Sequence, residues 1–248
     1  MINQDKSDVH LYDDSDALFE GAAQRWVALA HRAVEDHGGF HVALSGGSTP
    51  KGLYERLATP WFRDQVDWSR VHIYFGDERG VPPDHVDSNY RMAKEALLQH
   101  VSIPATQIHR LMAESDDLET TADGYAQLLE GQLPAGEGDT GRFDLVMLGM
   151  GPDGHVASLF PHTPVLSERR RPVAPVHVTQ LDTWRLTITL PVINNARHTM
   201  LLVAGKNKAA IMGEIMSDYH GHPRYPVEMI EPTDRLEWYM DRDAAPFL

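Results

Sequence analysis

The chain has 248 residues, of which 42% are hydrophobic, and its formal net charge is −14 at pH 7. It contains no cysteine, which excludes disulfide bridges, thiolate metal ligands and a cysteine nucleophile. The acidic charge argues against a nucleic-acid partner, because clustered Lys and Arg supply most of the affinity for phosphate backbones. No apolar run approaches the roughly 18 residues that span a bilayer, and the polar start lacks a signal-peptide pattern. We therefore expect a cytoplasmic protein with no nucleic-acid and no membrane partner.

The first half of the chain alternates short β-rich runs with amphipathic stretches. Asp14 or Ser15 can cap a helix whose apolar residues keep an i, i+4 spacing until Gly38 and Gly39 end it. Pro50 suits the first position of a later helix, because its fixed φ is helical and its missing N–H would have no partner there. The predicted elements, in chain order, are a strand at 9–12, this first helix, a strand at 40–44, the helix that begins at Pro50, a strand at 71–75 and a helix near 90–99.

The second half continues the same alternation after a further helix. The polar stretch 134–141 has the composition of a surface loop rather than of a linker between domains. Strands that alternate with helices pair in parallel through right-handed crossovers and carry helices on both faces of the sheet. We therefore expect an α/β fold in which residues 1–248 form a single domain around a doubly wound, mostly parallel sheet. The predicted elements here are strands at 143–148, 172–178, 185–190 and 199–204, a helix at 206–217 and an edge strand at 235–240.

The loop SGGSTP at 45–50 is a candidate phosphate-binding site, because it follows a strand and opens a helix. Ligands of open parallel sheets bind beyond the carboxyl ends of the strands, where small residues expose N–H groups and hydroxyls to phosphate oxygens. A P-loop would require glycine where Lys51 stands, and a nucleophile elbow would require glycine where Ala43 stands, so neither motif is present. A tight turn with a Ser/Thr cap is the alternative. The candidate residues are Ser45, Gly46, Gly47, Ser48 and Thr49.

Charged residues near other strand ends are candidates to hold a polar or anionic ligand. Asp77 and Arg79 follow a predicted strand within the sequence GDER. They either hold a polar ligand at the end of that strand or belong to an ordinary charged surface turn. Arg185 lies in a later predicted strand. Lys208 falls in the first turn of a predicted helix, where a cation is unfavourable to the helix dipole unless an anion is bound. Solvated surface cations are the alternative, which we keep for Lys206.

The segment LGMGPDGHVASLFP, residues 148–161, contains the G-x-G-x-x-G spacing of dinucleotide-binding proteins. NAD binding is not favoured, because the pattern lies past mid-chain and prolines soon close the stretch that should form a helix. The three glycines instead allow positive φ angles and a close approach of substrate to the backbone. Asp153 and His155 project from this turn, and an imidazole beside a carboxylate can accept a proton near neutral pH. A histidine that makes only a structural hydrogen bond is the alternative.

Several segments match one known family in sequence and in order. They are ALSGGSTPKGLYERL (43–57), GDER (76–79), SNYRMAKEALL (88–98), LGMGPDGHVASLFP (148–161), WRLTITLPVINNA (184–196) and VAGKNKA (203–209). On these residues the chain resembles the 6-phosphogluconolactonase family over nearly its whole length. The resemblance implies a Rossmann-like fold shared with glucosamine-6-phosphate deaminases. It further implies hydrolysis of 6-phospho-D-glucono-1,5-lactone to 6-phosphogluconate in the oxidative pentose phosphate pathway, with no metal and no cofactor.

The same resemblance implies roles for the candidate site residues. His155 would be the general base that activates water, and Asp153 would help to hold that histidine or the sugar. Asp77 is expected to contact sugar hydroxyls. The positions expected to grip the 6-phosphate or to polarise the lactone, beside the loop from Ser45 to Thr49, are Arg79, Arg185 and Lys208.

Two other functions stay open at this point. In the deaminases the block around the histidine reads D-G-H-I-A-F-N-E-P, and Phe160 stands where that glutamate would be, so a proton-transferring group is missing. A non-catalytic protein that binds sugar phosphates would have the same pocket, and only an assay separates it from an enzyme. The expected partner is a small phosphorylated sugar lactone, and the expected assembly is a monomer or a small homo-oligomer.

Overall fold

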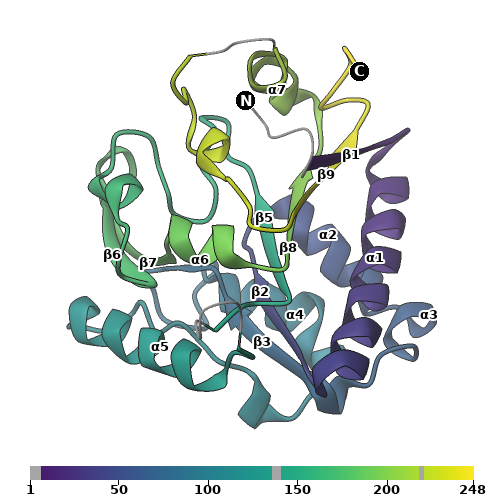
Figure 1. Ribbon diagram of the computed structural model, residues 1–248, viewed down its shortest axis with the longest axis vertical. Coiled ribbons are helices and arrows are strands. Elements are labelled where there is room, and N and C mark those ends of the chain that lie inside the picture. The colour runs from purple at the N-terminus through teal and green to yellow at the C-terminus, as the bar shows by residue number, and fades with distance from the viewer. Residues whose placement is uncertain (1–6, 136–140, 218–220) are drawn as a thin grey trace.

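A six-stranded sheet forms the centre of the molecule, with its strands in the order β1-β9-β8-β5-β2-β3 (Figure 1). The computed structural model describes residues 7–135, 141–217 and 221–248, so the middle of the predicted 134–141 loop lies outside the described residues. Every pair of neighbouring strands in this sheet is parallel, which confirms the predicted α/β class. The strands are β1 (Ser7–Tyr12), β2 (Phe40–Leu44), β3 (Val71–Phe75), β5 (Leu145–Gly149), β8 (His198–Val203) and β9 (Arg235–Asp241).

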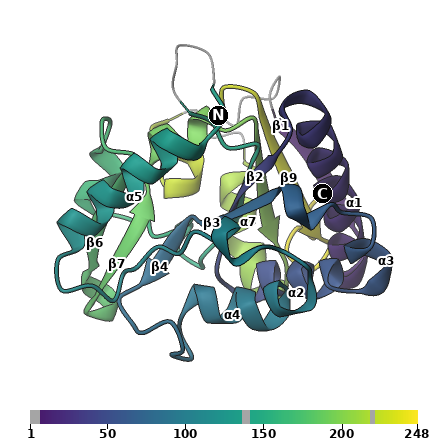
Figure 2. The same ribbon diagram turned by 90° about the horizontal axis from the view of Figure 1, so that it is seen from below.

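Helices cover both sides of the main sheet. Figure 2 shows α2 and α4 on one side and α5 on the other, and α1 packs against β1, β2 and β9. The predicted ends of α1 are confirmed, because the Asp14 side chain accepts a hydrogen bond from the Ala17 N–H and Gly38 is left-handed with φ 88°. No helix in the described part of the chain is long and apolar enough to span a membrane. The helices are α1 (Ser15–His37), α2 (Ser48–Leu57), α3 (Pro60–Arg63), α4 (Asn89–Ala96), α5 (Leu118–Gln132), α6 (Leu190–Asn195) and α7 (Ala209–Ile215).

Three strands form a separate antiparallel sheet in the order β4-β7-β6, beside β3 and α5 (Figure 2). The predicted strands 172–178 and 185–190 therefore pair with each other, which corrects the expectation that all strands join one sheet. The connection between them is a short 3-10 turn, Thr179–Leu181, whereas a parallel pair needs a crossover of about a dozen or more residues. The strands of the small sheet are β4 (Asp77–Arg79), β6 (Val173–Val178) and β7 (Thr183–Ile188).

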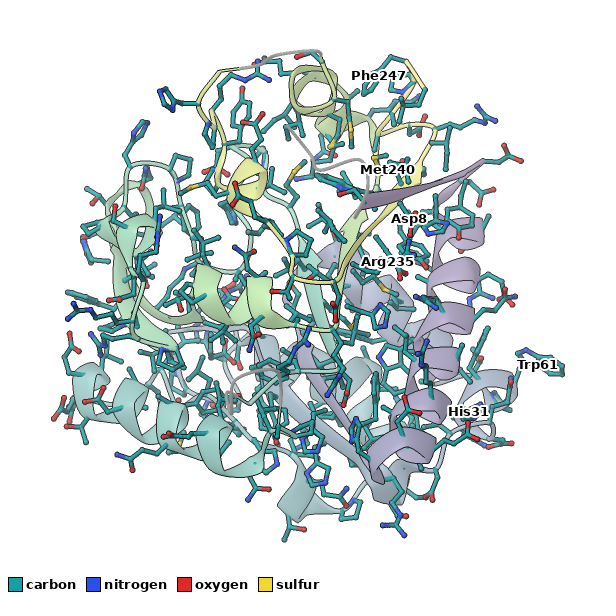
Figure 3. All side chains as sticks on the ribbon, viewed as in Figure 1. Asp8, His31, Trp61, Arg235, Met240 and Phe247 are labelled. Atoms are coloured by element: carbon teal, nitrogen blue, oxygen red, sulfur yellow. The ribbon has the colours of Figure 1, made fainter. Side chains whose placement is uncertain are left out.

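The last strand, β9, lies between β1 and β8 rather than at the edge predicted for residues 235–240. Its charged side chains are satisfied by partners on neighbouring elements. Glu237 is buried and forms an ion pair with Arg25 of α1. Arg235 Nη1 lies 2.6 Å from Asp8 Oδ2 of β1. Figure 3 labels both residues. These ion pairs allow a strand with charged residues to sit inside the sheet.

The starts of two helices differ from the prediction by a few residues. α2 begins at Ser48, so Pro50 is its third residue rather than its first. A proline at this position still costs the helix no hydrogen bond, because N–H groups in the first turn have no intrahelical acceptor. The predicted helix at 206–217 is a 3-10 turn, Lys206–Lys208, followed by α7. Both differences leave the preceding loops at the carboxyl ends of β2 and β8.

Three histidine rings stack beside β2 and β3. The ring centroids of His41 and His72 lie 4.5 Å apart, and those of His72 and His109 lie 5.8 Å apart. Burial lowers the pKa of all three side chains, and for His41 the pKa falls to about 3. The neighbouring histidines add to the decrease for His41, because like charges repel. The folded protein therefore resists protonation of this stack.

We expect the free energy of unfolding to decrease as the pH falls below about 6.5, because the unfolded chain then binds protons that the folded chain does not. The contribution of the neutral histidines to the free energy of unfolding is fully present above the ordinary histidine pKa. It is lost progressively as the pH falls toward the pKa of about 3 that His41 has in the folded state. Urea titrations between about pH 7.5 and 4.5 measure the effect. In His41→Phe the ring stays stacked but cannot be protonated, so its stability should depend less steeply on pH. Equal slopes in the two proteins would contradict this role of His41.

Candidate active site

The carboxyl ends of β2 and β5 form a crevice in the middle of the main sheet. In the main sheet, the strand that follows β2 along the chain is β3, on one side of this pair, whereas the strand that follows β5 is β8, on the other side. Ligands of doubly wound sheets bind at such a switch point. A pocket of about 190 Å³ lies there, and Asp153, the one predicted site residue that does not line it, is hydrogen-bonded to one that does. The predicted residues that line it are Ser45, Gly46, Gly47, Ser48, Thr49, Asp77, Arg79, His155, Arg185 and Lys208.

His155 and Asp153 form a hydrogen-bonded pair at one wall of the pocket. His155 Nδ1 lies 2.5 Å from Asp153 Oδ1, and the imidazole stacks on Phe160 with 3.9 Å between ring centroids. Burial raises the pKa of Asp153, but the hydrogen bond and charge of His155 outweigh burial and hold that pKa below its usual value. A carboxylate can only accept a hydrogen bond, so Nδ1–H is the donor in this contact, and Nε2 is the ring nitrogen that does not take part in it.

The absence of a side chain at position 151 makes room for this pair. A Cβ atom on Gly151 would lie 2.1 Å from the His155 ring and 2.7 Å from Asp153 Oδ1. Of the three glycines in the motif, Gly154 alone has a positive φ, at 74°. The expectation of positive φ is therefore wrong for Gly149 and Gly151. Glycine at position 151 therefore matters for the space that it leaves to this pair rather than for its backbone angle.

Arg79 and Arg185 are cross-strand partners in the small sheet, so both guanidinium groups lie on the face that lines the pocket. The Nε atoms of both are buried and have no hydrogen-bond partner among the described residues. Arg185 is 8% exposed, and burial lowers its pKa; the charge of Asp77 opposes this decrease and the charge of Arg79 adds to it. Like charges directly opposite each other destabilise a sheet. An anion in the pocket would offset that repulsion.

The loop before α2 and the segment before α7 complete the pocket. Gly47 has φ 100°, a value that favours glycine, and it precedes Ser48, the first residue of α2. Within the described chain no side chain caps this helix, and uncapped N–H groups at a helix N-terminus attract anions. Lys208 directly precedes α7. Burial lowers the pKa of Lys208, while the nearby carboxylate of Asp153 opposes that decrease.

A buried network supports Asp77 at the edge of the pocket. Its Oδ2 accepts a 2.6 Å hydrogen bond from Ser158 Oγ, and its Oδ1 accepts a 3.1 Å hydrogen bond from Asn89 Nδ2. Glu78 accepts hydrogen bonds from the N–H of its neighbour Arg79, from two backbone N–H groups at the start of α4 and from the Ser88 hydroxyl. Sequence reasoning assigned no role to Ser158, Asn89 or Glu78. All three lie within the matched motifs, which is the signal that could have drawn attention to them.

These features define an α/β protein whose pocket, at the switch point of its sheet, is lined by two arginines, a lysine and a histidine that is hydrogen-bonded to an aspartate. Among residues 7–135, 141–217 and 221–248, no group of three or more histidine and acidic side chains is placed to hold a metal ion.

Comparison with known proteins identifies the family. Residues 13–238 match the model of the glucosamine-6-phosphate isomerases/6-phosphogluconolactonase family, and the chain belongs to it. A 6-phosphogluconolactonase of Synechocystis sp. is 42% identical over 86% of this chain and 87% of its own. One of Nostoc sp. is 37% identical over 97% of this chain and 98% of its own. The solved structure of 6-phosphogluconolactonase from Trypanosoma brucei has a TM-score of 0.84 at 26% identity, covering 98% of this chain and 99% of that one.

Proposed function

We propose that this chain hydrolyses 6-phospho-D-glucono-1,5-lactone to 6-phosphogluconate. The observation that carries the proposal is the pocket in which Arg79, Arg185 and Lys208 share one cavity with His155, whose ring is hydrogen-bonded to an aspartate. The relatives named 6-phosphogluconolactonase, at 37% and 42% identity, support the same reaction. The phosphate of this substrate supplies an anion for the cations. Its lactone supplies a carbonyl carbon that water attacks with the help of a base.

In the proposed mechanism, Nε2 of His155 accepts a proton from water while the water oxygen attacks the lactone carbonyl carbon. Asp153 holds the imidazole through Nδ1 and stabilises the positive charge that forms on it. The bond between the carbonyl carbon and the ring oxygen then breaks, and the imidazolium returns the proton to that oxygen. The new carboxylic acid loses a proton to solvent. Water is therefore the only co-substrate.

The phosphate does not react, but its binding orients the ring for attack. Arg79, Arg185 and Lys208, together with the N–H groups at the start of α2, are the groups proposed to hold it. The cation that lies nearest the lactone carbonyl would stabilise the oxyanion, and one such donor typically contributes about 3 kcal/mol. A positioned base typically contributes a further factor of about 10² to 10⁴.

Replacement of Lys208 by alanine is expected to raise KM for the lactone about tenfold or more and to change kcat less, because a charged hydrogen bond contributes roughly 1.5 to 3 kcal/mol. The ammonium is proposed to bind the phosphate in the ground state and in the transition state alike. Loss of such uniform binding raises KM. Steady-state kinetics on freshly prepared lactone measure both constants.

Lys206→Ala is the matched control for this prediction. The Lys206 side chain is 83% exposed and lies 3.9 Å from Asp243, and surface pairs of this kind contribute little. Its KM should equal that of the wild type. If KM is unaltered in Lys208→Ala as well, Lys208 does not belong to the phosphate site.

The proposed reaction is tested by following proton release from freshly prepared 6-phospho-D-glucono-1,5-lactone with and without EDTA. The rate of release without protein gives the baseline, because the lactone also reacts slowly with water alone. Rapid release that EDTA does not change supports metal-independent hydrolysis. Release at the baseline rate would contradict the proposal.

Two further measurements separate this function from the deaminase and from the non-catalytic binding protein. A deaminase would release ammonia from glucosamine 6-phosphate. Phe160 argues against this activity, because a hydrocarbon ring stacked on His155 cannot transfer the proton that the deaminase glutamate transfers. Binding of the lactone without turnover would identify a non-catalytic sugar-phosphate-binding protein.

A further inference from the structure

We propose that Ser158 is a positioning residue that keeps Arg185 free to bind the anionic substrate. Its hydroxyl group engages the Asp77 carboxylate and so keeps the ion pair between Asp77 and Arg185 from closing to hydrogen-bond distance. This inference rests on the proposed function, since it makes an anionic group of the substrate the intended partner of Arg185.

The three side chains form one buried cluster. Ser158 Oγ donates a hydrogen bond to Asp77 Oδ2 over 2.6 Å, and Arg185 Nη1 donates to Ser158 Oγ over 3.4 Å. The same Nη1 atom lies 4.0 Å from Asp77 Oδ2. A direct charged hydrogen bond would be about 2.7 to 2.9 Å long. The serine hydroxyl therefore bridges two opposite charges that form only a long ion pair and no direct hydrogen bond.

The backbone turn around Ala157 fixes the serine in this place. Ala157 is left-handed with φ 48°, an unfavourable conformation for a residue with a Cβ atom. The Ser158 N–H donates to Thr187 Oγ1 over 3.2 Å, and the Leu159 N–H donates to the Val156 carbonyl over 2.9 Å. Strained backbone conformations of this kind persist where surrounding contacts hold them, and they are found most often at functional sites. The turn thus holds the hydroxyl within the cluster.

Without this hydroxyl, Asp77 and Arg185 would be each other's best partners. Asn89 Nδ2 satisfies Asp77 Oδ1, but Asp77 is 4% exposed, so water cannot readily replace the Ser158 donor at Oδ2. The Nε of Arg185 has no hydrogen-bond partner in the described ranges, and Arg79 lies opposite with the same charge. A direct ion pair would relieve both groups. The substrate would then have to break that pair before it could bind Arg185.

Inorganic phosphate is a suitable probe, because its binding requires no turnover. Calorimetry measures its affinity for the wild type, Ser158→Ala, Asp77→Asn and the double variant, and KM and kcat for the lactone are measured on the same proteins. We expect Ser158→Ala to weaken phosphate binding and to raise KM about tenfold, with a smaller change in kcat. In the Asp77→Asn background the same serine change should have less than about a twofold effect, because a neutral amide cannot form the ion pair.

Losses of equal size in both backgrounds, or no loss in either, would overturn the inference, and so would a wild type that does not bind phosphate. Should Ser158→Ala fail to fold, Ser158→Cys keeps the shape with a weaker donor, and its smaller loss should again disappear in Asp77→Asn. If the wild type does not hydrolyse the lactone but the phosphate affinities follow the expected pattern, the proposed function fails while the role of Ser158 stands. If the wild type hydrolyses the lactone but Ser158→Ala causes equal losses in both backgrounds, the proposed function stands while the role of Ser158 fails.

Discussion

A variant in which alanine replaces His155 should turn over the lactone with a kcat lower by a factor of roughly 10² to 10⁴, while its KM stays close to the wild-type value. The imidazole is proposed to take up the water proton in the transition state, so its loss removes an interaction that the bound substrate does not yet use. The cations proposed to hold the phosphate come from β4, β7 and the turn before α7, so they stay in place. Proton release at saturating lactone gives kcat, and its dependence on lactone concentration gives KM.

His31→Ala is the control for the loss of an imidazole elsewhere in the molecule. His31 lies on α1 (Figure 3), and its Nε2 atom is 2.6 Å from the Gln65 carbonyl oxygen. This variant should keep the wild-type kcat. Melting temperatures of both variants confirm that the proteins are folded when they are assayed. If the kcat of His155→Ala equals that of the wild type, the imidazole is not the base.

The place of the pocket could be predicted because it depends on short-range features of the chain. Apolar runs such as 40–44 and 71–75 are long enough for a strand and are followed by residues that turn. A parallel sheet brings the carboxyl ends of its strands to one edge, so loops far apart in the sequence could be expected to meet. Asp153 and His155 lie two positions apart in one tight turn, so their pairing needs no long-range contact.

The partners across the pocket could not be predicted, because they depend on register and packing. Arg79 faces Arg185 only through the alignment of β4 on β7, and one residue of slip would turn one of the two side chains to the opposite face. The contact of Ser158 with Asp77 depends in the same way on how the 148–161 turn packs against the small sheet. The sequence pattern of one segment does not indicate which residues of the other segment will lie opposite it. Tertiary contacts, rather than local sequence, determine these pairs.

One methyl group added at position 151 should disable the site nearly as strongly as loss of the imidazole. In Gly151→Ala the new Cβ atom would lie 2.1 Å from the His155 ring, whereas real Cβ contacts essentially never fall under 3.0 Å. The ring cannot move aside without losing its stacking on Phe160 or its hydrogen bond to Asp153. We expect kcat to fall roughly 10²-fold, as is typical when a group moves about 1 Å from its catalytic position, with little change in KM. The proton-release assay measures both constants.

Gly124→Ala separates this effect from the general effect of adding a methyl group to a glycine. Gly124 lies in α5, where a Cβ atom would meet nothing within 4 Å. The substitution should stabilise the protein by about 0.5 to 1 kcal/mol and leave kcat unchanged. The atoms displaced in Gly151→Ala belong to side chains, so its melting temperature is expected to stay close to that of the wild type. If Gly151→Ala keeps the wild-type kcat, the reaction does not depend on the observed position of the imidazole, and the proposed base loses its geometric support.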